Sequence, residues 1–223
     1  MKKFGFVLRT LLAKAVASTF AVLLAQTAWA HPHEWIDLTV QFKFDEEKRL
    51  IALEQSWLFD PFFSAYVLDE LTADRPNRKR VLEQGEALGP EMVSNLSKHG
   101  YLNNWTFQDT PIEAVNGTFV SVQLKNRNRM ELTFQVDLPE PLDLTTGAFE
   151  YSVFDPLYYI EILHAERFRP RLRGGPRGCR STIIQPEPDE DYIIYAAELD
   201  RTDNAEEGLG QHFAERVVIS CQR

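Results

Sequence analysis

The chain has 223 residues, and its 33 Asp and Glu outnumber its 24 Lys and Arg, so the formal net charge is −9. Because nucleic-acid phosphates are bound by a cationic face, this balance argues against a nucleic-acid partner. An acidic surface suits a protein that attracts cations, although many acidic globular domains share it.

Residues 1–30 have the pattern of a cleaved export signal. A positively charged start precedes an apolar stretch at 15–24 that is short for a bilayer span, and residues 28–30 read Ala-Trp-Ala, a small-x-small cleavage pattern. We predict cleavage there rather than retention as an anchor, which leaves residues 31–223 in the periplasm. The removed segment contains four cations and no acids, so the net charge would change from −9 to −13.

Cys179 and Cys221 are the two cysteines, and both lie in the exported part. In an oxidising compartment an even pair predicts a disulfide rather than a metal or catalytic site. Such a bridge would tie the C-terminus to the body of the protein, which is a structural role.

Alternation of apolar and polar residues predicts strands along most of the mature chain. Residues 36–44 are apolar at even positions, so His33, Trp35 and Asp37 fall on the polar face of a half-buried strand. Further strand patterns lie at 51–59, 118–124, 130–138, 149–154, 158–163, 180–184 and 217–221. The second and third of these flank a polar turn and predict an antiparallel hairpin.

Helical composition is concentrated in three stretches, at 61–71, 79–99 and 189–199. Gly89-Pro90 predicts a break within the second stretch. We therefore expect an α+β fold over residues 31–223. Its body should be an antiparallel, mainly β sandwich, with a helical insertion at about 61–100 and a short C-terminal helix.

The segment Arg167–Arg177, RFRPRLRGGPR, is basic and rich in Gly and Pro, which predicts a loop. On an acidic chain such a loop could contact lipid headgroups or a protein partner. A solvated linker is the simpler interpretation, and composition leaves these alternatives open.

Two stretches share the pattern Phe-Asp-Pro followed by an apolar and an aromatic residue, and each follows a predicted strand. Their aspartates are Asp60 and Asp155. Aspartate accepts hydrogen bonds from the backbone that follows it, and proline fixes φ. The residues by themselves therefore favour turns that end the two strands.

The chain has none of the common enzyme signatures, such as GxSxG, HExxH, CxxC or a phosphate-binding glycine loop. Scattered Ser, His and Asp carry little information, because a catalytic triad is defined by geometry. We therefore expect that the protein is not an enzyme. His99, His164 and His212 are isolated, and each is expected to be a surface or hydrogen-bonded residue.

The His-Pro-His sequence at 31–33 begins the mature chain if the predicted cut occurs. His31 would then offer an α-amino nitrogen and an imidazole to a divalent metal, and His33 a second imidazole. Pro32 has no amide hydrogen, which excludes the square-planar arrangement with deprotonated backbone amides. The remaining ligands suit Zn²⁺, Cu²⁺ or Ni²⁺. A frayed terminus that binds nothing is the alternative.

Five segments taken together resemble the ZevA-like periplasmic proteins, a family often described as a periplasmic component of an ABC-type transport system. They are HPHEWID after the signal, WLFDPFFS, SVFDPLYYIEI, a Gly-Cys ahead of PEPDE, and the terminal FAERVVISC. The resemblance covers essentially the whole exported chain. It implies a protein encoded beside a nickel/cobalt-efflux-type permease, with a role in zinc acquisition. It also implies that Asp60 and Asp155 are partners of His31 and His33 at a metal site.

These observations lead to one main functional hypothesis and two alternatives. The main one is a periplasmic accessory protein that binds Zn²⁺, or less readily Ni²⁺, Co²⁺ or Cu²⁺, and works with an inner-membrane metal permease. The first alternative is a β-domain that docks on the permease and regulates or stabilises it without binding metal. A copper-dependent oxidase built on the amino-terminal histidine is a more distant third.

Overall fold

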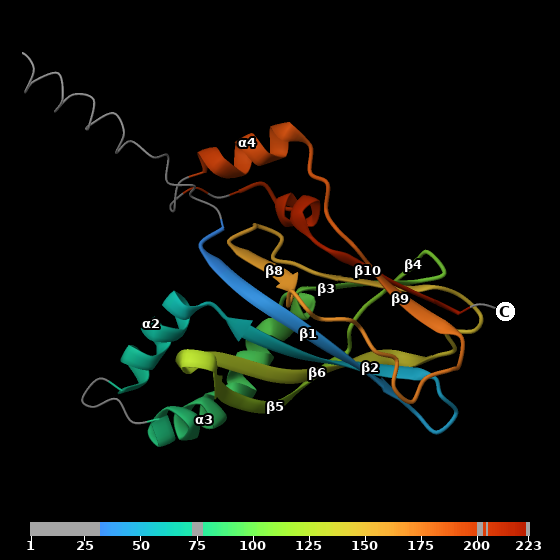
Figure 1. The fold of residues 1–223 in the computed structure, drawn as a ribbon, viewed down its shortest axis with the longest axis horizontal. Coiled ribbons are helices and arrows are strands. Elements are labelled where there is room, and N and C mark those ends of the chain that lie inside the picture. Colours follow the sequence, from blue (N-terminus) through green and yellow to red (C-terminus); the bar gives the residue numbers. More distant parts are fainter. Residues whose placement is uncertain (1–31, 73–77, 200–202, 204, 222–223) are drawn as a thin grey trace, which may run out of the picture.

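The computed structural model describes residues 32–72, 78–199, 203 and 205–221 (Figure 1). The predicted export signal and His31 lie outside the described residues. Within them the chain forms two β-sheets with helices at their margins, so the predicted α+β, sandwich-like fold is confirmed.

The first sheet has the strand order β5-β6-β2-β1-β8 and the second has the order β4-β3-β7-β10-β9. The first contains β1 (Glu34–Phe44), β2 (Leu50–Phe59), β5 (Asn116–Lys125), β6 (Arg129–Leu142) and β8 (Ile160–His164). The second contains β3 (Asn103–Phe107), β4 (Thr110–Ile112), β7 (Phe149–Val153), β9 (Cys179–Ile184) and β10 (Arg216–Cys221). Strand pairs in the described chain are antiparallel except β1 with β8, which is parallel.

The predicted hairpin is present as β5 and β6, joined by a short 3₁₀ turn at Asn126–Asn128. Strands β3 and β4 were not predicted. Both are short, at five and three residues, and too brief for a clear alternation.

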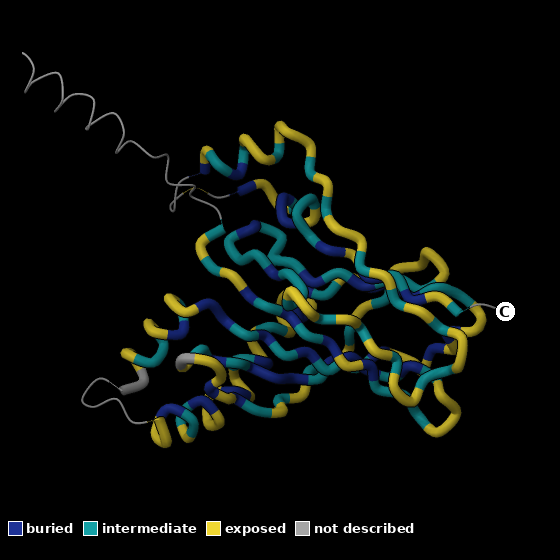
Figure 2. The backbone as a smooth tube through the Cα atoms, viewed as in Figure 1, coloured by how far each residue is buried: buried dark blue, intermediate teal, exposed yellow. Residues whose placement is uncertain are grey.

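The hydrophobic core lies between the two sheets, and Figure 2 shows buried backbone concentrated in their strands. Phe42 of β1 contacts Tyr151 of β7 edge-to-face, with ring centroids 5.9 Å apart. A polar link crosses the same core, because the Gln55 side-chain amide donates to Asn103 Oδ1 at 2.6 Å. Gln55 is fully buried, and it also accepts a hydrogen bond from the Trp57 indole at 3.0 Å. These bonds satisfy an amide that would otherwise be costly to bury.

In sequence, two helices follow β2 and precede β3, where helices were predicted: α2 (Pro61–Thr72) and α3 (Arg78–Ser97). A third helix, α4 (Glu190–Glu198), precedes β10. The break predicted at Gly89-Pro90 is wrong, because α3 continues through Pro90. Gly89 instead allows α3 to approach β5 closely, since a Cβ at this position would overlap the ring of Phe119. Packing of the helix on the sheet outweighs the local proline penalty.

The predicted disulfide between Cys179 and Cys221 is present. The two residues are opposite each other in the β9–β10 pairing and 42 positions apart in sequence. The bridge thus joins the last strand to an edge strand of the second sheet. None of the described helices is long and apolar enough to cross a membrane.

Candidate functional site

The two Asp-Pro turns flank the first residues of β1. Strand β2 runs antiparallel to β1 and ends beside its start, where Asp60 N donates to Trp35 O at 2.9 Å. Strand β8 runs parallel to β1 and begins beside the same end, where His33 N donates to Tyr159 O at 2.9 Å. The mixed pairing therefore brings two turns that are distant in sequence to one end of the sheet.

Asp60 organises the start of α2. Its Oδ1 accepts hydrogen bonds from Phe62 N at 2.6 Å and Phe63 N at 3.1 Å, and only 6% of the residue is exposed. A carboxylate in this position satisfies free N–H groups of the first helical turn and interacts favourably with the helix dipole. The turn predicted from the Asp-Pro pattern is therefore present here.

Asp155 organises the turn that leads into β8. Its Oδ1 accepts from Leu157 N at 3.1 Å, and its Oδ2 accepts from Tyr159 N at 2.8 Å and Ile160 N at 3.2 Å. The residue also lines a hollow of about 500 Å³ together with His99. The predicted turn is again present, without a helix after it.

His33 is exposed, and its ring stacks on Tyr159 with the centroids 5.8 Å apart. His31, the other predicted histidine ligand, lies outside the described residues. Among the residues that the structure describes, no three His, Cys, Asp or Glu side chains lie close enough to hold a metal ion. The structure thus places His33, Asp60 and Asp155 around one strand end without closing a metal site from them.

Glu34 is a further carboxylate at this end of β1, which the sequence reasoning did not select. It falls on the even-numbered face of β1 with buried Ile36 and Leu38. Its Oε1 is buried and has no hydrogen-bond partner in the described part of the chain. Burial, and then the negative charge of Asp60, raise the pKa of Glu34 to about 7. Glu34 occupies an even-numbered position, as the buried residues of this strand do, and that position was the signal in the sequence that could have identified it.

A second cluster of titratable groups joins the two sheets through His164. The Glu215 carboxylate accepts from His164 N at 2.6 Å and lies 2.7 Å from His164 Nδ1, while Tyr151 Oη lies 2.9 Å from His164 Nε2. The side chains of His164 and Glu215 are 3% and 7% exposed. This cluster is enclosed in the core, so we assign it a structural role. The expectation that His164 is a hydrogen-bonded histidine is confirmed.

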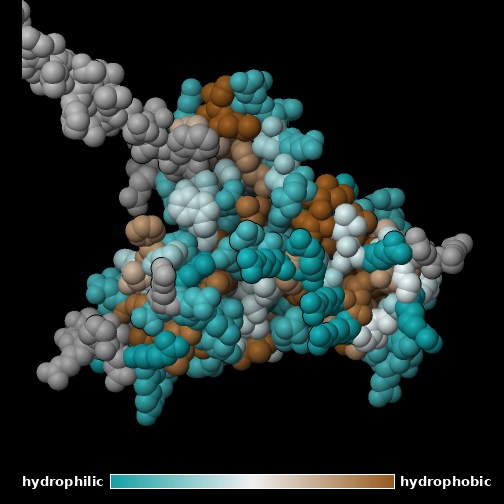
Figure 3. Space-filling view, in the orientation of Figure 1, coloured by the Kyte–Doolittle hydropathy of each residue, from teal (hydrophilic) through white to brown (hydrophobic). Residues whose placement is uncertain are grey.

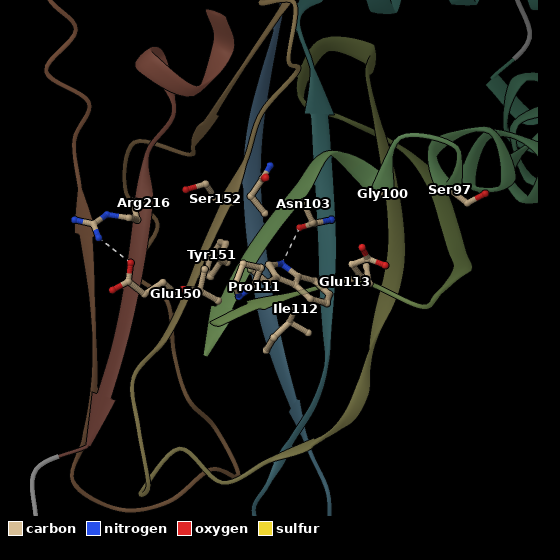
Figure 4. A pocket seen from close by; sticks show the side chains of 14 residues that line it. Ser97, Gly100, Asn103, Pro111, Ile112, Glu113, Glu150, Tyr151, Ser152 and Arg216 are labelled. Carbon is tan, nitrogen blue, oxygen red and sulfur yellow. Dashed lines mark hydrogen bonds and ion pairs between the residues drawn. The ribbon is translucent and has the colours of Figure 1, made fainter. Parts of the chain in front are cut away.

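A larger hollow of about 640 Å³ lies on the second sheet beside the end of α3 (Figure 4). Its Arg216 is paired with Glu150 at 2.7 Å, and the Trp105 indole donates to Asn103 Oδ1 at 3.2 Å. Of the predicted metal ligands that the structure describes, His33, Asp60 and Asp155, none lines this hollow. This hollow is therefore separate from the strand-end arrangement.

The fold and this arrangement define a two-sheet α+β sandwich protein with two neighbouring carboxylates at the start of its first strand. The chain belongs to the family described as a protein of unknown function, DUF1007, whose pattern matches residues 16–221. It is 26% identical over 201 residues to an uncharacterized protein of Haemophilus influenzae, an alignment that covers 86% of this chain and 92% of the relative. No solved structure matches it.

Proposed function

We propose that this chain is a periplasmic accessory protein that binds a divalent metal ion, with Zn²⁺ preferred over Ni²⁺, Co²⁺ or Cu²⁺. It delivers the ion to, or receives it from, an inner-membrane metal permease of the nickel/cobalt-efflux type. Its chemistry is ion binding and transfer, and the protein is not an enzyme.

The observation that carries this proposal is the unsatisfied carboxylate of Glu34 beside Asp60. Two neighbouring acids, one with a buried oxygen that accepts no hydrogen bond from the described residues, are costly when both are ionised unless a cation lies nearby. His33 is the adjacent residue, and His31 would add an imidazole and, after cleavage, an amine. Nitrogen and carboxylate oxygen together form an ordinary ligand set for zinc.

Cellular location and partner rest on other features. The disulfide fits an oxidising compartment, and the pattern of residues 1–30 fits export to the periplasm. The resemblance to the ZevA-like proteins supports the permease partner and zinc as the ion.

Zinc titration of the mature, metal-free protein by calorimetry tests this proposal. Two changes should each weaken zinc binding: His33→Ala, and the addition of one residue before His31. Each loss should exceed the ~10–100-fold that is typical when a residue that hydrogen-bonds a metal ligand is replaced. Glu34→Gln should weaken binding while keeping the shape of the side chain. Affinity should also fall between about pH 7 and 5 as the imidazoles become protonated.

Glu46→Gln is the matched control, because it removes one negative charge from an exposed residue in the turn that follows β1, at the far end of the strand from His33 and Glu34. It should leave zinc affinity nearly unchanged. Equal affinity of the native and extended forms would remove the amine from the ligand set. A Glu34→Gln variant that binds zinc as tightly as the native protein would exclude Glu34 as a group that binds the ion, and the proposal rests on that group.

A second candidate function, docking on the permease without metal, is favoured by exposed aromatic residues on α2. Phe62 is 86% exposed and Tyr66 is 63% exposed, one helical turn apart on the same face. Trp35, at the strand end beside Asp60, is 45% exposed. Exposed aromatic groups of this kind are typical of protein interfaces.

Copurification with the cognate permease distinguishes the two candidates. Under the docking hypothesis Phe62→Ser with Tyr66→Ser should abolish copurification, whereas Val115→Ser with Val120→Ser, which changes exposed apolar residues away from Trp35 and α2, should not. Unimpaired docking by a protein that binds no zinc at neutral pH would favour the second candidate.

A further inference from the structure

The segment between β8 and β9, residues 165–178, crosses from one sheet to the other and is called the strap here. Its residues alternate in exposure from 167 to 173. Phe168 and Leu172 pack against the core, and Phe168 stacks on His164 with the ring centroids 5.3 Å apart. The exposed positions from 167 to 173 are all arginines, namely Arg167, Arg169, Arg171 and Arg173. The apolar residues therefore anchor an extended segment that presents a row of guanidinium groups.

A groove of about 350 Å³ separates the strap from the second half of β1, and the four arginines and Val40, Gln41 and Phe42 line it. The strap is fixed on both sides of this groove. Ala165 N donates to Leu38 O at 2.9 Å, and Gly175 packs against the ring of Phe44. Figure 3 shows hydrophilic residues along this face of the molecule, where the strap crosses in front of β1.

The floor of the groove is an open sheet edge. Backbone groups of a strand point alternately to its two neighbours. Trp35 O bonds to the β2 side and Leu38 O to the strap side, so Val40 and Phe42 direct their backbone groups toward the groove. Strand β8 ends at His164, and no backbone hydrogen bond from the described part of the strap reaches these two residues. Free N–H donors are thus available beside the arginines.

The positive charge on the strap is not neutralised within the described chain. None of the four arginines takes part in an ion pair there, and Arg169 donates only to the neighbouring Phe168 O at 2.6 Å. Residues 165–180 hold six arginines and one acid, Glu166, in a chain whose net charge is −9. One planar guanidinium group can donate two parallel hydrogen bonds to the oxygens of a phosphate. Several closely spaced arginines therefore suit a phosphate better than a single carboxylate.

We propose that this groove binds a phosphate-bearing ligand. Because the strap closes the groove at both ends, the volume suits a compact group with several negative charges rather than a length of polypeptide. Two sources carry that chemistry, a soluble phosphorylated molecule and the headgroup of an anionic phospholipid. The site is separate from the strand end near His33, so it operates with or without metal.

Titration of the disulfide-bonded protein with tripolyphosphate by calorimetry at low salt tests the site. Arg169→Gln with Arg171→Gln should lower the affinity by more than tenfold, since each lost charge-assisted hydrogen bond is worth about a factor of ten or more. Arg171→Lys keeps the charge and loses the planar fork, so it should bind with intermediate affinity.

The matched control is Arg177→Gln with Arg180→Gln, which removes the same charge from exposed residues outside the groove. It should change the affinity by less than about threefold, in keeping with screened long-range attraction. Equal losses in the two double variants would overturn the site in favour of general electrostatic attraction. An absence of binding by the native protein would also overturn it.

Vesicles distinguish the two sources. If the ligand is a lipid headgroup, the native protein should bind phosphatidylcholine vesicles that contain phosphatidylglycerol, and the groove double variant should not. If the ligand is soluble, tripolyphosphate should bind in a groove-dependent manner and the protein should not bind the vesicles that contain phosphatidylglycerol. Vesicle binding that the two double variants lose equally would contradict the groove as a headgroup site.

Discussion

Glu34 and Glu215 are both carboxyl groups withdrawn from water, yet their surroundings shift their pKa values in opposite directions. Burial and the charge of Asp60 raise the pKa of Glu34 to about 7. Burial also acts to raise the pKa of Glu215, but hydrogen bonds from His164 and Gln185 outweigh it and lower that pKa. One carboxyl therefore opposes folding when ionised, and the other supports it.

Glu34→Gln should stabilise the metal-free protein at about pH 8. The folded pKa of Glu34, about 7, lies above its ordinary 4.5, so its favourable contribution is complete below about pH 4.5 and is lost as the pH rises toward 7. Glutamine does not ionise and avoids that loss. Urea unfolding without metal should therefore show a gain at about pH 8 and none at about pH 4. A loss of stability at the higher pH would contradict this assignment.

Glu215→Gln should destabilise the protein near neutral pH by about 1.5–3 kcal/mol, the range for hydrogen bonds to a charged group. The folded pKa of Glu215 is lowered, so its contribution is present above the ordinary value of 4.5 and is lost as the pH falls below it. The native protein and the variant should then converge in stability under acid conditions. Chemical unfolding across this pH range measures the difference, and a gap that persists at low pH would argue against an ionised Glu215.

At the scale of elements, one sequence pattern produces two structures. After β2, Phe-Asp-Pro begins a helix, because Asp60 accepts the first amides of α2. After β7, the same pattern forms an irregular turn in which Asp155 accepts amides up to Ile160. The Phe-Asp-Pro pattern therefore specifies a turn in which the aspartate accepts backbone amides, and it does not specify whether a helix follows.

Asp60 allows the capping and metal-binding roles to be separated. Asn is about as good an N-cap as Asp, so Asp60→Asn should change the stability by less than about 0.5 kcal/mol, whereas Asp60→Ala should cost about 1 kcal/mol, within the usual range of ~0.5–2. If Asp60 also attracts zinc, Asp60→Asn should weaken zinc binding despite its stability. Thermal unfolding and zinc titration of the same samples measure both effects. Unchanged zinc affinity would show that Asp60 caps α2 and does not contribute to zinc binding.

For the whole molecule, β10 is a central strand of the second sheet although it is the last strand in sequence. It pairs with β7 on one side and β9 on the other, and the disulfide fixes its end to β9. Formation of the complete second sheet therefore depends on residues 216–221, which join β7 to β9.

Replacement of Cys179 and Cys221 by Ser should lower the free energy of unfolding by about 2–5 kcal/mol. Zinc affinity should not change, because neither cysteine lies near the start of β1. Denaturant unfolding beside zinc titration checks both statements. A fall in zinc affinity in variants that remain folded would show that the bridge has more than a structural role.

Part of the candidate site was predictable and part was not. The two Asp-Pro turns are local patterns, so the sequence alone identified them, and the prediction that His-Pro-His begins the mature chain rests on residues outside the described part. Glu34 was missed because its burial depends on which face of β1 meets the core and on the arrival of Asp60 beside it. The groove was missed for a similar reason, since it exists only where β8 ends and the strap continues beside β1.

The sequence by itself determined the elements whose signals are local: the alternating strands, the β5–β6 hairpin, the helical regions and the pair of cysteines. Tertiary structure alone decided the order of the strands, the parallel pairing of β1 with β8, the continuity of α3 through Pro90, and the short strands β3 and β4. Periodicity records which side chains are buried, and it carries no information about the segment that buries them. Partner choice depends on contacts between residues far apart in the chain, and those contacts can outweigh a local preference such as the proline penalty in α3.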